Sequence, residues 1–264
     1  MAHQHALFDA EALRALPAVR SIGMADLKEA LIRGVDDFRA MPSHAIFLCL
    51  IYPLVGFFLG GLTLGYNVLP LFYPLAAGFA LVGPFAAIGL YELSRRREQG
   101  LDAFWTDAFG IVHSPSFGAI AALGLTLMAI FVAWVASAQA LYQSLFGLHA
   151  PQSTMLFLRE VLTTPAGWWL IVLGNFIGFL FALLVLTISV VSFPLLLDRQ
   201  VGAVEAVLTS VRAVLLNPRT MAMWGLIVAG LLLIGSLPFF LGLAVVMPVL
   251  GHSTWHLYRR VVVR

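Results

Sequence analysis

Two histidines, His252 and His256, come closest to forming a metal site in this sequence. They are four residues apart, so on a helix they share one face, and a pair with that spacing can chelate a metal ion. No third ligand can be identified, and the neighbouring Trp255, Tyr258 and Arg259 are typical of a helix end at a membrane interface. We therefore interpret the pair as structural and expect neither a metal nor another cofactor.

Polar groups inside the apolar segments are the next candidates. Glu92 and Asp198 each have a basic residue within about one helical turn, Arg95 and Arg199, which favours ion-paired helix ends over catalytic carboxylates. Asn175 is the polar residue that lies deepest in an apolar stretch. It could line a pathway through the membrane, but we favour a hydrogen bond to a neighbouring helix.

A basic cluster and an aromatic residue suggest contact with lipid headgroups. Arg95, Arg96 and Arg97 follow one another directly, and Trp105 comes shortly after them. Each Arg near a membrane surface attracts anionic lipid by about 1 kcal/mol, and Trp is enriched at that surface. The same Arg cluster would serve equally well as a plain determinant of membrane topology.

Sequence motifs for enzymatic chemistry are missing. There is no phosphate-binding Walker loop, no GxGxxG after a strand, no HExxH and no CxxC. The single Cys49 excludes a disulfide within the chain, and no soluble segment is large enough to hold an active site. We expect a protein that is not an enzyme and does not bind nucleic acid.

The composition places these residues in a membrane protein. Of the 264 residues, 61% are hydrophobic and only 11% are charged, whereas soluble domains carry about 25% charged residues. The mean hydropathy is +0.96. So few charges cannot cover a water-soluble surface, so the predicted fold class is an all-α, polytopic membrane helix bundle.

The lengths of the charge-free stretches predict six membrane spans. Residues 45–91 contain no charge and would form a helix of about 70 Å, more than twice the thickness of the bilayer core, so the chain must fold back near Gly65. Residues 161–197 are long for one span and short for two spans with a turn, so we interpret them as one span that is bent near Pro194. The predicted spans are 45–65, 69–92, 116–142, 168–197, 220–237 and 239–258.

The positions of the basic residues predict the orientation. With six spans, every Lys and Arg except Arg159 falls on the side of the two termini. Because cytoplasmic loops carry the excess of Lys and Arg, this side is the cytoplasmic one. The predicted location is the bacterial inner membrane, with both termini in the cytoplasm.

Amphipathic segments precede each pair of spans. Residues 24–40, 98–113 and 201–216 place apolar residues three and four positions apart, which predicts three interfacial helices on the cytoplasmic side. Each ends near a Pro, so the chain reads as three repeats of interfacial helix and hairpin. The Pro residues could instead simply mark where helices begin. Residues 1–22 are predicted to be a flexible tail and 23–264 the membrane domain.

Two short stretches carry a resemblance to a known family. They are Gly83-Pro84-Phe85-Ala86-Ala87-Ile88-Gly89-Leu90-Tyr91-Glu92-Leu93-Ser94-Arg95-Arg96 and Gly34-Val35-Asp36-Asp37-Phe38. From about residue 20 onward the chain resembles an uncharacterised family of bacterial integral membrane proteins. Some members are labelled putative cytochrome c oxidase, and the pattern is also similar to the membrane domain of some glycerophosphodiester phosphodiesterases. The resemblance implies no catalytic residues.

Three functions remain open from the sequence. The first is a non-enzymatic scaffold or lipid-associated bundle, with membrane lipids and a second copy or another membrane protein as partners. The second is a small transporter or channel for an apolar or amphipathic solute, with a cavity near Pro84, Pro194 and Pro248. The third is an accessory subunit of a respiratory complex, although the scattered histidines do not form the ligand set of a haem–copper oxidase.

Overall fold

The computed structural model describes residues 16–42, 50, 54, 69–148, 151, 153–238 and 240–263. In these residues every regular element is a helix, and the one strand-like feature is an isolated antiparallel bridge between Val19 and Val262. The predicted all-α class is confirmed. In chain order the described helices are α2 (Met24–Ala40), η1 (Leu69–Leu71), α5 (Phe72–Phe79), η2 (Ala80–Val82), α6 (Gly83–Ala86), α7 (Ile88–Glu98), η3 (Trp105–His113), α8 (Phe117–Phe146), α9 (Thr154–Thr163), α10 (Pro165–Ser189), α11 (Ser192–Asp198), α12 (Ala203–Leu216), α13 (Pro218–Ser236) and α14 (Leu243–Val261).

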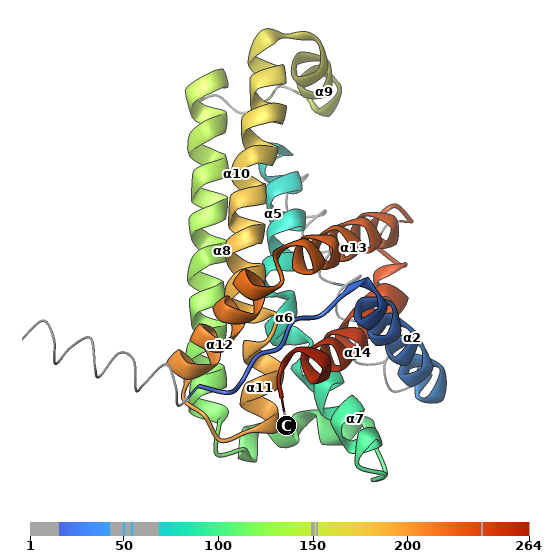
Figure 1. The fold of residues 1–264 in the computed structure, drawn as a ribbon. Helices are drawn as coiled ribbons and strands as arrows, with labels where there is room; N and C mark the ends of the chain where they lie inside the picture. The colour runs from blue at the N-terminus through green and yellow to red at the C-terminus, as the bar shows by residue number, and fades with distance from the viewer. Residues whose placement is uncertain are drawn as a thin grey trace, which may run out of the picture.

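Two long helices, α8 and α10, form the tall part of the molecule and lie side by side, with α5 packed against α8 (Figure 1). α8 runs for 30 residues without a charge or a Pro and ends at Phe146. The next residue, Gly147, has a φ of 80°, a backbone conformation that suits glycine. The side-chain oxygen of Thr164 caps α10 by accepting a hydrogen bond from the amide of Gly167, and Pro165 occupies the first turn.

Breaks divide two of the predicted spans into shorter helices. The α10 helix ends at Ser189, and α11 then carries the chain to Asp198, which places the interruption a few residues before Pro194, where a bend is expected. The chain from Phe72 to Glu98 is interrupted more often, and Pro84 stands in the first turn of the short α6.

Four helical stretches of the described chain are long and apolar enough to cross a membrane: Phe72–Glu98, Phe117–Phe146, Pro165–Asp198 and Pro218–Ser236. They correspond to four of the six predicted spans. The predicted span 45–65 lies outside the described residues. The helix α14, which corresponds to the predicted span 239–258, is not among the four, because polar and basic residues occupy its C-terminal half from His252 to Arg260.

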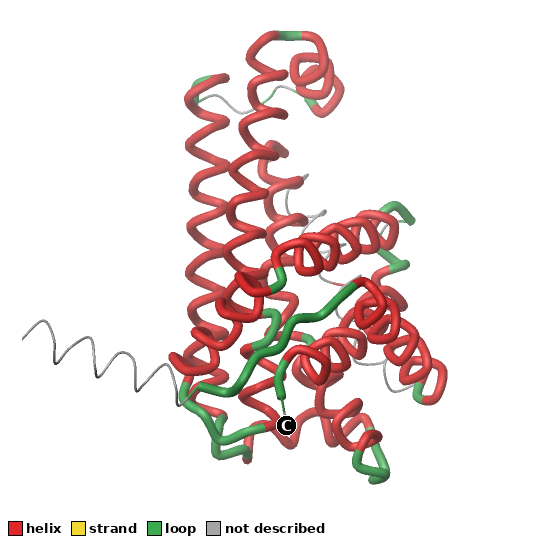
Figure 2. Tube along the Cα trace, in the orientation of Figure 1, coloured by secondary structure: helices red, strands yellow, loops and turns green. Residues whose placement is uncertain are grey.

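To the right of α8 and α10 in Figure 1 lie α2, α7, α13 and α14, where α2 packs against α14 and α13 runs across the direction of α8 and α10. An extended segment, residues 16–23, follows this group as a loop in Figure 2. The amide of Arg20 donates to the carbonyl of Val261, and the amide of Val263 donates to that of Ala18, each at 2.9 Å. Residues 16–22 of the predicted tail are therefore held in place, and the two ends of the described chain lie together.

The structure agrees with two of the three predicted amphipathic helices and differs from the third. α2 spans the predicted residues 24–40, and α12 covers nearly all of 201–216. The segment 98–113 was expected to be one helix, but α7 extends to Glu98, a turn with positive φ at Gly100 follows, and only Trp105–His113 is helical, as a 3-10 helix. The prediction of one helix over residues 98–113 is therefore wrong, since only residues 105–113 form a separate helix here.

Candidate functional site

A buried carboxylate, Asp37, is the centre of a polar cluster formed by α2, α7 and α14. Its Oδ2 atom accepts a hydrogen bond from the Ser94 hydroxyl at 2.6 Å and lies 2.8 Å from Nε2 of His256. Its Oδ1 atom accepts a hydrogen bond from the guanidinium of Arg97. The Ser94 Oγ atom also lies 2.7 Å from Nδ1 of His252. We call these five residues the Asp37 cluster.

The charge of Asp37 fixes the direction of the hydrogen bonds. Burial alone would raise the pKa of this carboxyl, but the hydrogen bonds from His256 and Ser94 outweigh burial and hold the pKa below its ordinary value. Because the ionised carboxylate can only accept, Ser94 must give its proton to Asp37 and accept one from Nδ1 of His252. The Nε2 atom of His252 has no hydrogen-bond partner in the described structure.

The cluster holds three helices together, and its geometry does not suit catalysis. Ser94 and His252 are 1% and 0% exposed, so no substrate can reach the hydroxyl. Within the described ranges, no three side chains of His, Cys, Asp or Glu are grouped so that they could hold a metal ion. Nε2 of His256, which a metal would need, points at Asp37. The arrangement is that of a buried carboxylate whose lone pairs are satisfied by hydrogen bonds and whose charge is paired with a partly exposed Arg97.

The spacing of the buried residues of α2 carries a sequence signal for Asp37. Leu27, Ala30, Gly34 and Asp37 form the buried face of α2, and their spacing of three and four residues places a carboxylate in the apolar stripe. A charged residue in that position must find partners in the core. Ser94 gave no such signal, because its neighbours in the chain are the Arg residues and its partners are far away in the sequence.

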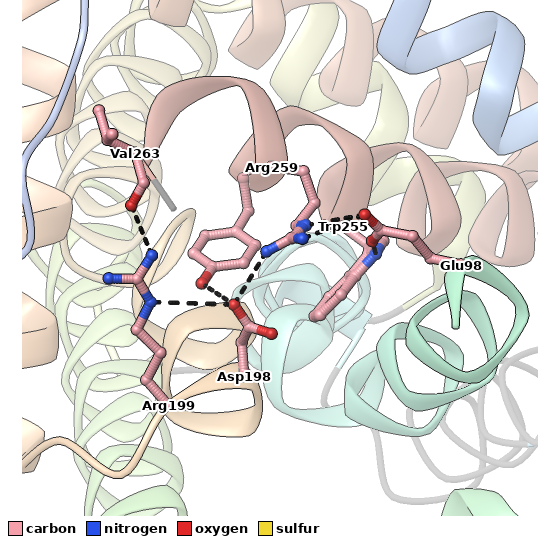
Figure 3. A network of polar contacts seen from close by, with 7 residues as sticks. Glu98, Asp198, Arg199, Trp255, Arg259 and Val263 are labelled. Carbon is pink, nitrogen blue, oxygen red and sulfur yellow. Dashed lines mark hydrogen bonds and ion pairs between the residues drawn. The ribbon is translucent and has the colours of Figure 1, made fainter.

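A second network joins the end of α14 to α7 and α11 (Figure 3). Asp198 accepts hydrogen bonds from the Tyr258 hydroxyl at 2.6 Å and from Arg259 at 3.1 Å. Glu98 accepts from the same guanidinium at 3.1 Å and from the indole nitrogen of Trp255 at 3.1 Å. The basic neighbour expected for Asp198, Arg199, is 4.0 Å away and donates to the carbonyl of Val263 instead. Asp198 is thus paired mainly by a residue from α14.

Each of the three Arg residues predicted to contact lipid headgroups forms an ion pair with a different acidic residue. Arg95 forms two hydrogen bonds with Glu92, at 2.8 and 3.0 Å. Arg96 lies 3.3 Å from Asp107 of η3, and Arg97 pairs with Asp37. A polar cavity of about 370 Å³ is lined by Arg95, Arg96 and Arg199 and by equally many acidic side chains, from Glu92, Asp107 and Asp198. The formal charges of these Arg and acidic side chains balance.

The predicted interface residue Trp105 belongs to an exposed apolar surface on η3. It is 41% exposed and makes an edge-to-face contact with Phe109, with ring centroids 6.1 Å apart. Phe104 and Phe109 are each 57% exposed, and Val112 is 58% exposed. We call these four residues the η3 patch. Arg96 ties the patch to α7 through its ion pair with Asp107 and its hydrogen bond to the carbonyl of Asp102.

Asn175 contacts a neighbouring helix and lines a cavity. Its Oδ1 atom accepts a hydrogen bond from the Tyr73 hydroxyl of α5 at 2.8 Å, and its Nδ2 atom donates to the carbonyl of Ile171 at 2.8 Å. The cavity has a volume of about 320 Å³ and lies between η1, α5, α8, α9 and α10. We call it the apolar cavity. Its walls include Pro74, Trp134, Ala138, Tyr142, Phe157, Leu158, Ile171 and Gly174.

The two glycines of α10 with GxxxG spacing have different surroundings. A Cβ atom on Gly178 would lie 3.1 Å from the indole of Trp134, so this glycine allows α10 to pack closely on α8. A Cβ atom on Gly174 would have its nearest neighbour, Leu141, at 3.8 Å. The motif thus accounts for a contact within the chain at Gly178 and for open space beside Gly174.

The long apolar helices of this all-helical fold define a polytopic integral membrane protein. Residues 72–198 match the model of a family described as predicted integral membrane protein (DUF2189). This match covers somewhat less than half of the chain and agrees with the resemblance to an uncharacterised family of integral membrane proteins that was drawn from the sequence. The match covers the stretch around Pro84 but not the Gly34–Phe38 stretch, which lies outside it. Comparisons with curated proteins and with solved structures each gave no match.

Proposed function

We propose that this protein is a non-enzymatic, lipid-associated membrane bundle whose η3 patch lies in the membrane interface. The observation that carries the proposal is the patch itself, in which Phe104, Trp105, Phe109 and Val112 are all exposed beside the paired Arg96. Exposed aromatic side chains next to cationic ones suit the headgroup region, where rings have an apolar body to bury and polar surroundings at their edges.

The proposal includes the topology expected from the sequence. Six spans, with the basic connections and both termini in the cytoplasm, would place η3 at the inner leaflet of a bacterial inner membrane. Support comes from the position of Arg95, Arg96 and Arg97 just before η3 and from the contact between residues 18–20 and 261–263. Membrane lipids are the proposed partners.

The alternative functions have less support. A transporter with its pathway at Pro84, Pro194 and Pro248 would place a cavity there, but neither the apolar nor the polar cavity is lined by these residues. A subunit of a respiratory complex has no specific contact in its favour among the described residues. The lipid-associated bundle is therefore the function that we carry forward.

The depth of the η3 patch tests the proposal. In a Cys49→Ser background, a nitroxide spin label at Phe109→Cys should be more accessible to oxygen than to a water-soluble nickel complex, because the side chain is immersed among lipids. The full-length protein in phosphatidylethanolamine and phosphatidylglycerol vesicles is the sample, and electron paramagnetic resonance is the measurement.

Two labels provide the matched references. Gln99→Cys, in the exposed turn before η3, should report water, and Phe176→Cys, which is 57% exposed on α10, should report lipid. If the label at Phe109 behaves like the one at Gln99, the patch does not lie in the membrane and the proposal is wrong.

A further inference from the structure

The apolar cavity lies at one end of the two long helices. α8 starts at Phe117, near the polar cavity with its Arg residues, and the cavity walls come from its other end, at Trp134, Ala138 and Tyr142. α9 packs against α10 at this end, and its Leu158 completes the wall (Figure 1). The apolar cavity therefore lies at the end of the membrane helices opposite to the Arg residues of the polar cavity.

Three polar side chains of the cavity wall, Tyr73, Trp134 and Asn175, are already paired. Tyr73 donates to Asn175 at 2.8 Å, and the indole nitrogen of Trp134 donates to the carbonyl of Pro74 at 2.7 Å. The remaining walls are mostly aliphatic and aromatic. A water molecule in a protein cavity needs two to four polar partners, and cavities without them stay dry or take up apolar molecules. These walls thus favour an apolar occupant.

The residues around the cavity indicate which apolar molecules can reach it. Val172 and Phe176 of α10 are 56% and 57% exposed, and they flank Asn175 on a helix that is apolar enough to span the bilayer. In a membrane these residues face acyl chains. Tyr73, which is 58% exposed, belongs both to the cavity wall and to this outer surface. The cavity is therefore continuous with the surface that lipid covers.

We propose that the apolar cavity binds one acyl chain of a bilayer phospholipid between α5, α8, α9 and α10. The proposal deepens the proposed function, since it rests on the same lipid-associated bundle and names the lipid component that is held. Its volume of about 320 Å³ is at the lower end of the usual range for ligand sites, which fits part of a chain rather than a whole lipid. Gly174 leaves the space, and the Tyr73–Asn175 pair forms its polar wall.

Photolabelling can separate a chain inside the cavity from lipid around the protein. The full chain is placed in nanodiscs of phosphatidylethanolamine and phosphatidylglycerol that contain a phosphatidylcholine with a diazirine on its acyl chain. Trp134, Ala138 and Tyr142 line the cavity and are only 4%, 9% and 7% exposed, so outer lipid reaches them poorly. Leu123 and Leu127 of the same helix are buried without lining the cavity and serve as references.

We expect labelling at Ala138 and Tyr142 to exceed that at Leu127 about tenfold, which corresponds to a preference of about 1.4 kcal/mol. Gly174→Leu, which fills the cavity, should reduce the labelling to the Leu127 level. Gly230→Leu on α13 should leave it unchanged, because no atom lies within 4 Å of a Cβ at that position. Helical content and elution volume of both variants verify folding.

Equal labelling of the cavity and reference residues in the unaltered protein would overturn the proposal, whether or not the variants fold. So would undiminished labelling in a folded Gly174→Leu protein. Neither result bears on the depth of the η3 patch, which is measured separately. Conversely, a water-exposed label at Phe109 together with cavity labelling would refute the surface role and retain the acyl-chain site.

Discussion

Replacing Asp37 with Ala is expected to lower the free energy of unfolding by about 1 to 3 kcal/mol, because the buried Ser94 and His256 are left without their acceptor, whereas Arg97 is partly exposed to water. Arg97 would lose its carboxylate, and Ser94 and His256 would each lose an acceptor in a site from which water is excluded. Thermal unfolding of the protein in mild detergent, followed by tryptophan fluorescence, measures the loss.

The neighbouring Asp36 supplies the control for this prediction. It is exposed on the same helix, so Asp36→Ala should change stability by less than about 0.5 kcal/mol. If the Asp37 and Asp36 variants unfold at the same temperature, the Asp37 cluster does not hold the three helices together.

The pH dependence of the same contact follows from the lowered pKa of Asp37. A carboxyl whose pKa is lower in the folded state than in the unfolded state stabilises the fold above its ordinary value of 3.8. That contribution is lost only as the pH falls through the folded-state value, which is lower still. Mild acidification from neutral pH should therefore leave the contribution of Asp37 intact.

Replacing Gly34 with Ala is expected to be the second large effect, at about 1 to 3 kcal/mol or more. A Cβ atom at this position would lie 2.0 Å from the Ser253 hydroxyl and 2.6 and 2.8 Å from the amide nitrogen and Cα of the same residue. Because two of these atoms belong to the backbone of α14, a change of rotamer cannot relieve the clash. The two helices must separate, and the adjacent Asp37 cluster would be strained with them.

Gly230→Ala is the matched variant for Gly34→Ala. Both positions are helical, but no atom lies within 4 Å of a Cβ at Gly230, so there Ala should be neutral or stabilising through its better helix propensity. The measurement is again thermal unfolding in detergent. Equal stability of the two variants would contradict the close packing of α2 on α14.

The long helices could be predicted because a chain in the apolar bilayer must satisfy its backbone hydrogen bonds internally. A stretch such as residues 117–146 has no charge and no Pro, so crossing the membrane as a helix is its only way to satisfy the backbone. The same rule predicts a span at 239–258, because His252 and His256 carry no fixed charge. The corresponding helix, α14, is not among the four candidate spans, and these two histidines contact Ser94 of α7 and Asp37 of α2.

The candidate sites could be predicted only in part. Asn175, Trp105 and the three Arg residues stood out by their type, but the partners that define their environment did not. Asp37 is 57 residues from Ser94 and 219 from His256, and no local pattern links positions so far apart. The apolar cavity was also beyond prediction, since it arises from the packing of separate helices around Gly174.

The claim on which the account depends is that the chain crosses the bilayer between Gln99 and Leu148, where α8 is the one candidate span among the described helices. Single Cys variants at these two positions, in the Cys49→Ser background, can be treated with a membrane-impermeant maleimide in intact cells and after lysis. We predict that Leu148→Cys reacts in intact cells and that Gln99→Cys reacts only after lysis. Reaction of both positions in intact cells, or of both positions only after lysis, would show that α8 does not cross the membrane.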